Sequence, residues 1–246
     1  MFPEICKIGP FTVYAYGLAL VAAFVVAINL AMRQAKKEGI SPELIFNFAF
    51  TVFLCGIAGA RIFYILSDLN FFLANPREMI MLQHGGLAWF GGMIAGSISG
   101  LIYLKVKGLN IFKALDLLVP FLALAQSIGR IGCLLNGCCY GRHSDFGLYF
   151  SVHEAVLIPT QMYSSFLLLI IFIVLRFLQD RPHAQGAIFF AYLFLYGAKR
   201  FGIEFLRDDS SRIFLGLTGF QCLSLAVFLI GLAGLLLIKK NPSANA

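Results

Sequence analysis

The chain has 246 residues, of which 60% are hydrophobic and only 13% are charged, and its mean hydropathy is +0.86. Soluble domains carry about 25% charged residues, so this composition excludes an ordinary soluble protein and indicates a polytopic membrane protein. The net charge of +7 comes without a long basic run interleaved with aromatic residues, so we expect no nucleic-acid partner.

The apolar segments are long enough to cross a bilayer about seven times. A spanning helix needs about 20 apolar residues, and such segments occupy residues 12–32, 44–66, 86–104, 112–130, 160–178, 186–206 and 216–238. The longer connections, 67–85 and 131–159, are expected to form a small extracytoplasmic cap or to lie on the membrane surface. The sequence therefore predicts an all-α polytopic membrane protein, with residues 1–246 forming a single integral membrane domain.

The basic residues predict the orientation of these spans. Alternate connections carry the positive charges Arg33, Lys36, Lys37, Lys105, Lys107, Lys113, Arg176, Arg181, Lys239 and Lys240. The positive-inside rule places these connections in the cytoplasm, with the N-terminus outside and the C-terminus inside. Only Lys7 precedes the first apolar segment, which is the reverse of a secretory signal peptide, so we expect that segment to be an uncleaved span.

Polar side chains gather toward the outer ends of the predicted spans. They are Tyr16, Arg61, Arg130, Gln161, Tyr163, Arg200, Glu204, Arg207 and Gln221, and His84 lies just before the third span. Ionisable groups within a membrane are functional candidates. A transport pathway would need polar residues through the full depth of the bilayer, so we instead expect one site near the outer headgroup level.

The charge at this level predicts the ligand. Guanidinium groups match phosphate oxygens and stay charged in a low dielectric, and arginines outnumber acids here: Arg61, Arg130, Arg142, Arg200 and Arg207. Glu204 lies one helical turn after Arg200 and is placed to orient it. The predicted ligand is an anionic phospholipid headgroup, with His84 as a candidate general base. The alternative is that these arginines only reach toward bulk lipid phosphates.

The stretch from Ser127 to Arg142 is rich in glycine and cysteine. Glycines disfavour a long regular helix and permit close backbone approach, and this stretch contains Gly129, Gly132, Gly137 and Gly141. Non-helical backbone at membrane depth survives only where protein or a watery cavity covers it. We therefore expect the chain to turn here and to form the wall of a pocket.

Several motifs, in chain order, resemble those of the bacterial prolipoprotein diacylglyceryl transferase family. They are Tyr16-Gly17-Leu18, Gly59-Ala60-Arg61, His84-Gly85-Gly86 with Phe90-Gly91-Gly92, Gly129-Arg130-Ile131-Gly132 with Asn136-Gly137 and Tyr140-Gly141-Arg142, Pro159-Thr160-Gln161-Met162-Tyr163, and Arg200-Phe201-Gly202-Ile203-Glu204-Phe205-Leu206-Arg207. The resemblance extends over most of the chain.

The resemblance implies an activity and its substrates. Family members move a diacylglyceryl group from phosphatidylglycerol to the lipobox cysteine in the signal peptide of a prolipoprotein, releasing glycerol phosphate. The implied location is the inner (plasma) membrane of a bacterium, in contact with membrane lipids, and no metal or cofactor is implied. Two alternatives stay open: a related phosphatidylglycerol-using transferase with another acceptor, and a non-catalytic lipid-binding paralogue.

The resemblance also implies residue roles. Arg130 and Arg200 would hold the phosphate, His84 would act as the base, and Glu204 would support Arg200. Substrate-binding positions would be Tyr16, Arg61, Asn136, Arg142, Gln161, Tyr163 and Arg207.

Three cysteines depart from the family pattern. Cys133 stands where the family most often has Asn, and Cys138 stands where it usually has Glu and is followed by Cys139. The preferred interpretation is that they are inert, small apolar residues. A disulfide from Cys133 to Cys138 or Cys139 is the second. Their spacing disfavours a metal site, and a thiol that carries the lipid covalently is weaker still.

Overall fold

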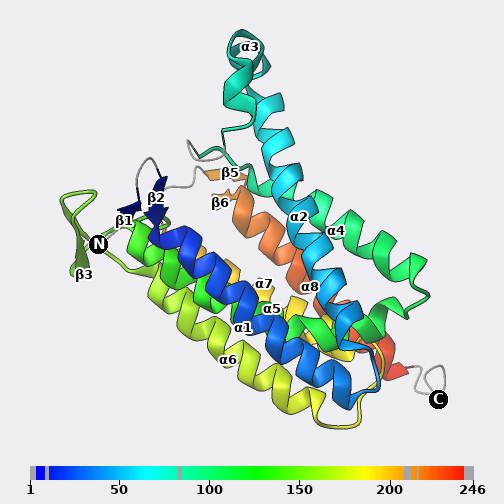
Figure 1. Cartoon of the computed structure of the whole chain (residues 1–246). Helices are drawn as coiled ribbons and strands as arrows, with labels where there is room; N and C mark the ends of the chain where they lie inside the picture. Colours follow the sequence, from blue (N-terminus) through cyan, green and yellow to red (C-terminus); the bar gives the residue numbers. More distant parts are fainter. Residues whose placement is uncertain (1–3, 9–10, 82–84, 208–211, 215, 241–246) are drawn as a thin grey trace. The chain divides into compact units, whose positions relative to one another are not determined.

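The computed structural model describes residues 4–8, 11–81, 85–207, 212–214 and 216–240 (Figure 1). Within this part of the chain the long helices are α1 (Ala15–Lys37), α2 (Pro42–Ser67), α4 (Trp89–Val106), α5 (Ile111–Asn136), α6 (Thr160–Gln179), α7 (Ala187–Glu204) and α8 (Gly219–Lys240). The short helix α3 (Leu69–Ala74) and the 3-10 turn η1 (Pro76–Met79) connect α2 to α4. The strands form two-stranded antiparallel hairpins: β1 (Glu4–Ile8) with β2 (Phe11–Tyr14), β3 (His143–Phe150) with β4 (Ala155–Leu157), and β5 (Arg212–Phe214) with β6 (Leu217–Thr218).

The chain is a multi-pass membrane protein with helices at all of the predicted spans. Five helices, α1, α2, α5, α6 and α8, are long and apolar enough to cross a membrane by themselves. Helix α4 is apolar but shorter over its described residues. Helix α7 carries Lys199, Arg200 and Glu204 in its last six positions, which lowers its apolar character at the end where the site was predicted.

The helices group into two compact units. The first comprises Met1–Ala31 with Leu115–Ala246, and the second comprises Met32–Ala114. The second unit is built on the pairing of α2 with α4, where Gly59 faces Gly91: a Cβ on Gly59 would lie 2.7 Å from the carbonyl oxygen of Gly91. The prediction of a single integral membrane domain stays a prediction.

The expected turn within Ser127–Arg142 is wrong for its first half. Helix α5 continues to Asn136, and Gly129 and Gly132 both lie inside it. At Gly132 the reason is packing, because a Cβ there would lie 2.7 Å from the Cβ of Ala19 on α1. The missing side chain lets α1 approach α5 closely, and the chain turns only at Gly137, where φ is +74°.

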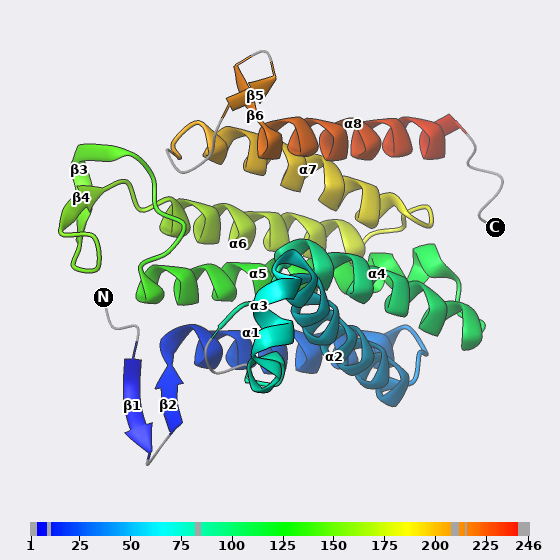
Figure 2. The ribbon, with the colours of Figure 1, turned by 90° about the horizontal axis from the view of Figure 1, so that it is seen from above.

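The first unit places α5, α6, α7 and α8 side by side (Figure 2). Apolar side chains from α5, α6 and α7 form its core: Val119, Ala123, Ile171, Leu175, Ile188, Ala191 and Tyr192. Side-chain hydrogen bonds also connect these helices. The Ser127 hydroxyl donates to the Ser165 carbonyl and the Ser165 hydroxyl donates to the Ser127 carbonyl, each at 2.8 Å. The Tyr192 hydroxyl donates to Gln126 at 3.0 Å, so α6 and α7 are both fixed against α5.

Asp116, in the first half of α5, has a structural role. Its carboxylate accepts hydrogen bonds from the backbone N–H groups of Gly186 at 2.5 Å and Phe189 at 2.7 Å. The first N–H groups of a helix have no partner within the helix. Asp116 on α5 therefore supplies the N-terminal cap of α7, which fixes where that helix begins.

Replacing Gly197 with alanine is expected to destabilise the protein. Helix α7 packs on α8 at this position, and a Cβ on Gly197 would lie 2.6 Å from the backbone nitrogen of Phe228 and 2.8 Å from the carbonyl oxygen of Ser224. Both contacts are backbone atoms that cannot move aside, so overpacking should cost about 1–3 kcal/mol. Thermal unfolding in detergent measures this cost. Gly202→Ala in the same helix is the control, because nothing lies within 4 Å of its Cβ, and equal melting temperatures for the two variants would contradict the packing argument.

Candidate functional site

The C-terminal end of α7 holds a buried acid between two arginines. The side chain of Glu204 is 0% exposed, and its Oε2 lies 3.0 Å from Nη2 of Arg200 and 3.9 Å from Nε of Arg207. Its other oxygen, Oε1, accepts a hydrogen bond from the Thr218 hydroxyl at 3.2 Å. Arg200 lies one turn before Glu204 on α7, and Arg207 lies in the turn that follows the helix, so Glu204 contacts both guanidinium groups.

Residues at the start of α8 contact Arg200 and the residue that binds Glu204. Its guanidinium carbon lies 5.0 Å from the centre of the Phe220 ring, within cation–π range. Gln221, buried on α8, accepts a hydrogen bond from the backbone N–H of Thr218 at 2.9 Å. The β6–α8 junction therefore contacts Glu204 through Thr218 and Arg200 through Phe220.

Positive charge outweighs negative charge around the Glu204–Arg200 ion pair. Arg130 on α5 acts electrostatically on both Arg200 and Lys199, and Arg207 acts on Arg200. Lys199 is buried, with its ammonium 4.6 Å from the centre of the Tyr196 ring. Glu204 balances one of these charges, and the remaining excess of buried and half-buried positive charge favours an anion that supplies several negative oxygens.

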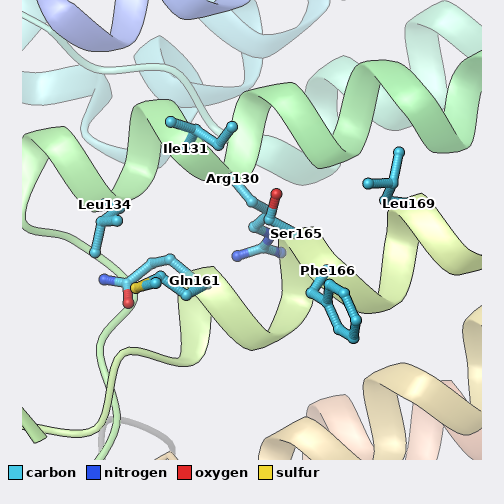
Figure 3. Close-up of a pocket in the computed structure, with 8 residues that line it drawn as sticks. Arg130, Ile131, Leu134, Gln161, Ser165, Phe166 and Leu169 are labelled. Atoms are coloured by element: carbon cyan, nitrogen blue, oxygen red, sulfur yellow. The ribbon is translucent and has the colours of Figure 1, made fainter.

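A pocket of about 300 Å³ begins at Arg130 and runs between α5 and α6 (Figure 3). It is lined by Arg130, Ile131, Leu134, Gln161, Met162, Ser165, Phe166 and Leu169. Most of this surface is apolar, and the guanidinium of Arg130 projects into the space between the two helices. The pocket thus offers an apolar channel with a cation at its side, which suits a molecule with an acyl chain and an anionic group.

The turn after α5 is held by the start of α6. The Thr160 hydroxyl donates to the carbonyl of Cys139, and Nε2 of Gln161 donates to the carbonyl of Cys138, both at 2.6 Å. Both side chains are almost fully buried. The amide oxygen Oε1 of Gln161 is also buried and has no hydrogen-bond partner among the residues the structure describes, so it can accept a hydrogen bond from a ligand.

Replacing Gln161 with leucine is expected to lower stability. The variant leaves the half-buried carbonyl of Cys138 without its donor, which should cost about 0.5–1.5 kcal/mol. The melting temperature of the purified protein measures this loss. Met162→Leu is the matched control because Met162 is 47% exposed, and a Gln161→Leu variant as stable as that control would show that the bond to the turn contributes nothing.

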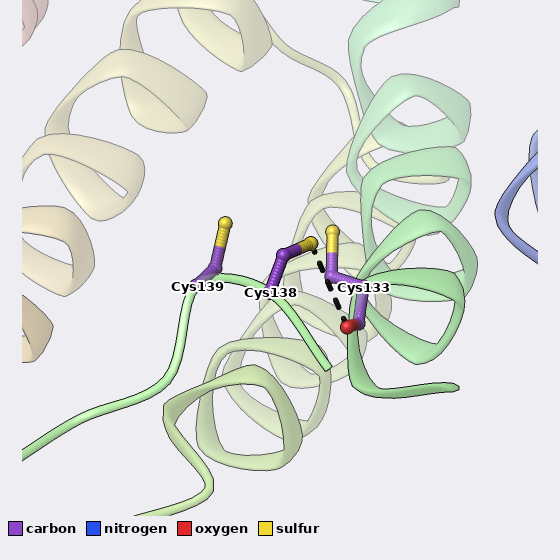
Figure 4. Close-up of side chains that lie close together, drawn as sticks. All are labelled: Cys133, Cys138 and Cys139. Atoms are coloured by element: carbon purple, nitrogen blue, oxygen red, sulfur yellow. Dashed lines mark hydrogen bonds between the residues drawn. The ribbon is translucent and has the colours of Figure 1, made fainter. Parts of the chain in front are cut away.

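The three cysteines of the turn lie together (Figure 4). Their sulfur atoms are all within 4.8 Å of one another, and the Cys138 thiol contacts the Cys133 carbonyl at 3.7 Å. All six cysteines of the chain are free thiols in the structure. Hydrogen bonds from Cys133 and Cys138 and the charges of Arg130 and Arg207 lower the pKa of Cys139 below its ordinary value.

The remaining predicted binding residues of the first unit lie around this turn or at the start of a neighbouring helix. Tyr16, in the first turn of α1, packs against Gly132, whose Cβ position lies 3.5 Å from the Tyr16 ring. Asn136 is the last residue of α5 and hydrogen-bonds the Cys138 side chain. The backbone N–H of Arg142 donates to the carbonyl of Leu206 at 2.9 Å, while its side chain is exposed. Tyr163 is exposed on α6.

Two predicted site residues are not placed with this group. Arg61 is buried in the second unit, where it donates to the carbonyls of Glu78, Met79, Met81, Gly85 and Gly86. Its hydrogen bonds hold the connection between α2 and α4, which gives it a structural role there. His84 lies outside the described residues.

Comparison with known proteins identifies the family. The family model for prolipoprotein diacylglyceryl transferase matches residues 3–237. The chain belongs to this family. Proteins named phosphatidylglycerol--prolipoprotein diacylglyceryl transferase are similar over nearly their whole length. The protein from Clostridium tetani is 33% identical over 94% of this chain and 96% of its own length. Those from Streptococcus pyogenes and Streptococcus mutans are 34% and 32% identical, over 97% of this chain and 95% and 96% of their own lengths.

Sequence reasoning missed three residues of this family member's site. Lys199 directly precedes Arg200, and its burial beside Arg130 could have been suspected from two adjacent cations inside a predicted span. Thr218 carried no such signal, because its contact with Glu204 depends on the β6–α8 junction folding back on α7. Phe220 was likewise indistinguishable from the many other phenylalanines of the chain.

Proposed function

We propose that this chain transfers the diacylglyceryl group of phosphatidylglycerol to the lipobox cysteine thiol of prolipoproteins and releases glycerol phosphate. The observation that carries the proposal is the excess of positive charge at the buried Lys199 and the half-buried Arg130, Arg200 and Arg207, beside an apolar pocket. The relatives' names state the same donor and the same acceptor class.

The reaction is a displacement at a glycerol carbon. The thiolate sulfur of the acceptor forms a C–S bond, the C–O bond to the phosphate breaks, and the electron pair leaves with the phosphate oxygen. Negative charge therefore grows on the phosphate in the transition state, where preorganised cations lower the barrier most. Arg130 and Arg200 supply those cations, and His84 takes the proton of the acceptor thiol.

The other residues bind and position the lipid. An acyl chain lies along the apolar pocket between α5 and α6, next to Phe166 and Leu169. The buried oxygen of Gln161 accepts a hydrogen bond from a headgroup hydroxyl. Arg207 adds charge to the phosphate site, and Tyr16, Asn136, Arg142 and Tyr163 border the acceptor side.

The protein acts in the bacterial inner membrane. The proposed orientation has the N-terminus outside and the C-terminus in the cytoplasm, and the positive charges of the alternate connections support it. This orientation puts the C-terminal end of α7 and the turn after α5 at the outer leaflet, where secreted prolipoproteins arrive.

Purified protein supplied with phosphatidylglycerol and a lipobox peptide tests the proposal. The expected product is a peptide whose mass has increased by one diacylglyceryl group, together with one glycerol phosphate released per peptide. A peptide with serine in place of the lipobox cysteine is the control and should stay unmodified. Release of glycerol phosphate with no modified peptide would point to another acceptor, and lipid binding without any release would contradict catalysis.

A further inference from the structure

We propose that Cys133, Cys138 and Cys139 form a binding site for one thiophilic metal ion, such as Zn²⁺ or Cd²⁺. Sulfur ligands lie about 2.3 Å from a zinc ion, so two sulfurs on the same ion are separated by about 4 Å. The three sulfur atoms are already within 4.8 Å of one another. Side-chain rotations that move the sulfur atoms by about an ångström or less therefore bring all three within bonding distance of one ion.

The backbone around the cluster is fixed in advance. The backbone N–H of Cys138 donates to the carbonyl of Cys133 at 3.1 Å, which closes the turn onto the end of α5. Thr160 and Gln161 bond the carbonyls of Cys139 and Cys138, and the His153 ring bonds the carbonyl of Gly137 at 2.9 Å. A site whose backbone is already ordered loses little conformational entropy when a ligand binds.

One of the ligands adopts an uncommon backbone conformation. Cys139 has a φ of +64°, in the left-handed region that few residues other than glycine adopt. Together with the left-handed Gly137, this conformation reverses the chain within a few residues. The Cys139 sulfur lies within 4.8 Å of those of Cys133 and Cys138, which the sequence spacing alone did not predict (Figure 4).

Two arginines act on one of the three proposed ligands. Metal binding requires deprotonated sulfur, and three adjacent thiolates repel one another. The positive charges of Arg130 and Arg207 act on Cys139 and offset part of that repulsion. Thiolate ligands select soft or borderline ions over Mg²⁺ and Ca²⁺. Three protein sulfurs leave the fourth tetrahedral position of the ion to water or an external thiol.

Titration of the reduced, purified protein with Cd²⁺ tests the site, because each Cd–thiolate bond absorbs in the ultraviolet. We expect one Cd²⁺ per chain after gel filtration, the absorbance of three thiolate ligands, and a higher melting temperature. The variant Cys133→Ser/Cys138→Ser/Cys139→Ser should lose all three effects. The matched control is Cys6→Ser/Cys55→Ser/Cys222→Ser, which removes the same number of thiols elsewhere and should keep them.

The outcomes separate this proposal from its alternatives. Equal Cd²⁺ binding by the two triple variants would overturn it, as would no binding by the reduced wild-type protein. A disulfide that joins Cys133 to Cys138 or Cys139 in protein isolated without reductant would also overturn it. Gel filtration and thermal unfolding establish that the cluster variant is folded. None of these measurements depends on transferase activity. A failure of the metal-site proposal would therefore leave the proposed function untouched, and the reverse also holds.

Discussion

Arg130→Ala and Arg200→Ala are each expected to reduce kcat/KM for diacylglyceryl transfer at least about 100-fold. Removing a single donor from a site that stabilises developing negative charge costs about 10²–10³ in rate, and a buried guanidinium contributes charge in addition to hydrogen bonds. Steady-state rates with phosphatidylglycerol and a lipobox peptide measure the effect. Arg130 and Arg200 come from α5 and α7, so a loss in both variants is the result expected if two helices bind one phosphate.

Two further variants make this prediction specific. Arg181→Ala is the control, because Arg181 is exposed beyond the far end of α6 and stacks on Phe177. It should keep the wild-type rate. The double variant Arg130→Ala/Arg200→Ala should lose less than the product of the single losses, because groups that act on one phosphate are not independent. Wild-type turnover in either single variant would remove that residue from the phosphate site.

Glu204→Gln is expected to destabilise the protein by about 3–5 kcal/mol, because it leaves buried guanidinium groups without their counter-charge. Glu204 is the acid that pairs with both Arg200 and Arg207, and its side chain is 0% exposed. The amide cannot replace the charge, although it can still contact Thr218. Thermal unfolding in detergent measures the loss, and the variant that folds should also show a lower kcat, because Arg200 is no longer held in place.

The control for this prediction is another acid paired with an arginine at the same spacing. Asp180 lies 3.1 Å from Arg176, but its side chain is 63% exposed. Exposed pairs of this kind contribute about 0–1 kcal/mol, so Asp180→Asn should leave the melting temperature nearly unchanged. If Glu204→Gln were as well tolerated as Asp180→Asn, the buried pair would have no role in stability.

The helices of the fold were predictable because long apolar segments leave few alternatives in a membrane. Each predicted span coincides with a helix, although α1 begins at Ala15 and ends at Lys37, several residues later than expected. The hairpins were not predicted. Strands of two to eight residues such as β5 and β3 carry little periodic signal, and their pairing depends on turns that the surrounding structure selects.

The site was predictable in its charges but not in its contacts. The i,i+4 spacing of Arg200 and Glu204 was enough to predict their pairing, and the structure confirms it at 3.0 Å. The burial of Lys199 and the bond from Thr218 to Glu204 both require knowledge of which helices pack together. The glycine pattern after Ser127 was misread, because glycine also occurs inside membrane helices where a neighbouring helix approaches closely.

The structure of the protein with phosphatidylglycerol and a lipobox peptide carrying serine in place of cysteine tests the account most directly. We expect the lipid phosphate to lie within hydrogen-bonding distance, about 2.7–2.9 Å, of the guanidinium groups of both Arg130 and Arg200. One acyl chain should run between α5 and α6. A phosphate bound elsewhere, with Arg130 and Arg200 directed toward bulk lipid, would contradict the account.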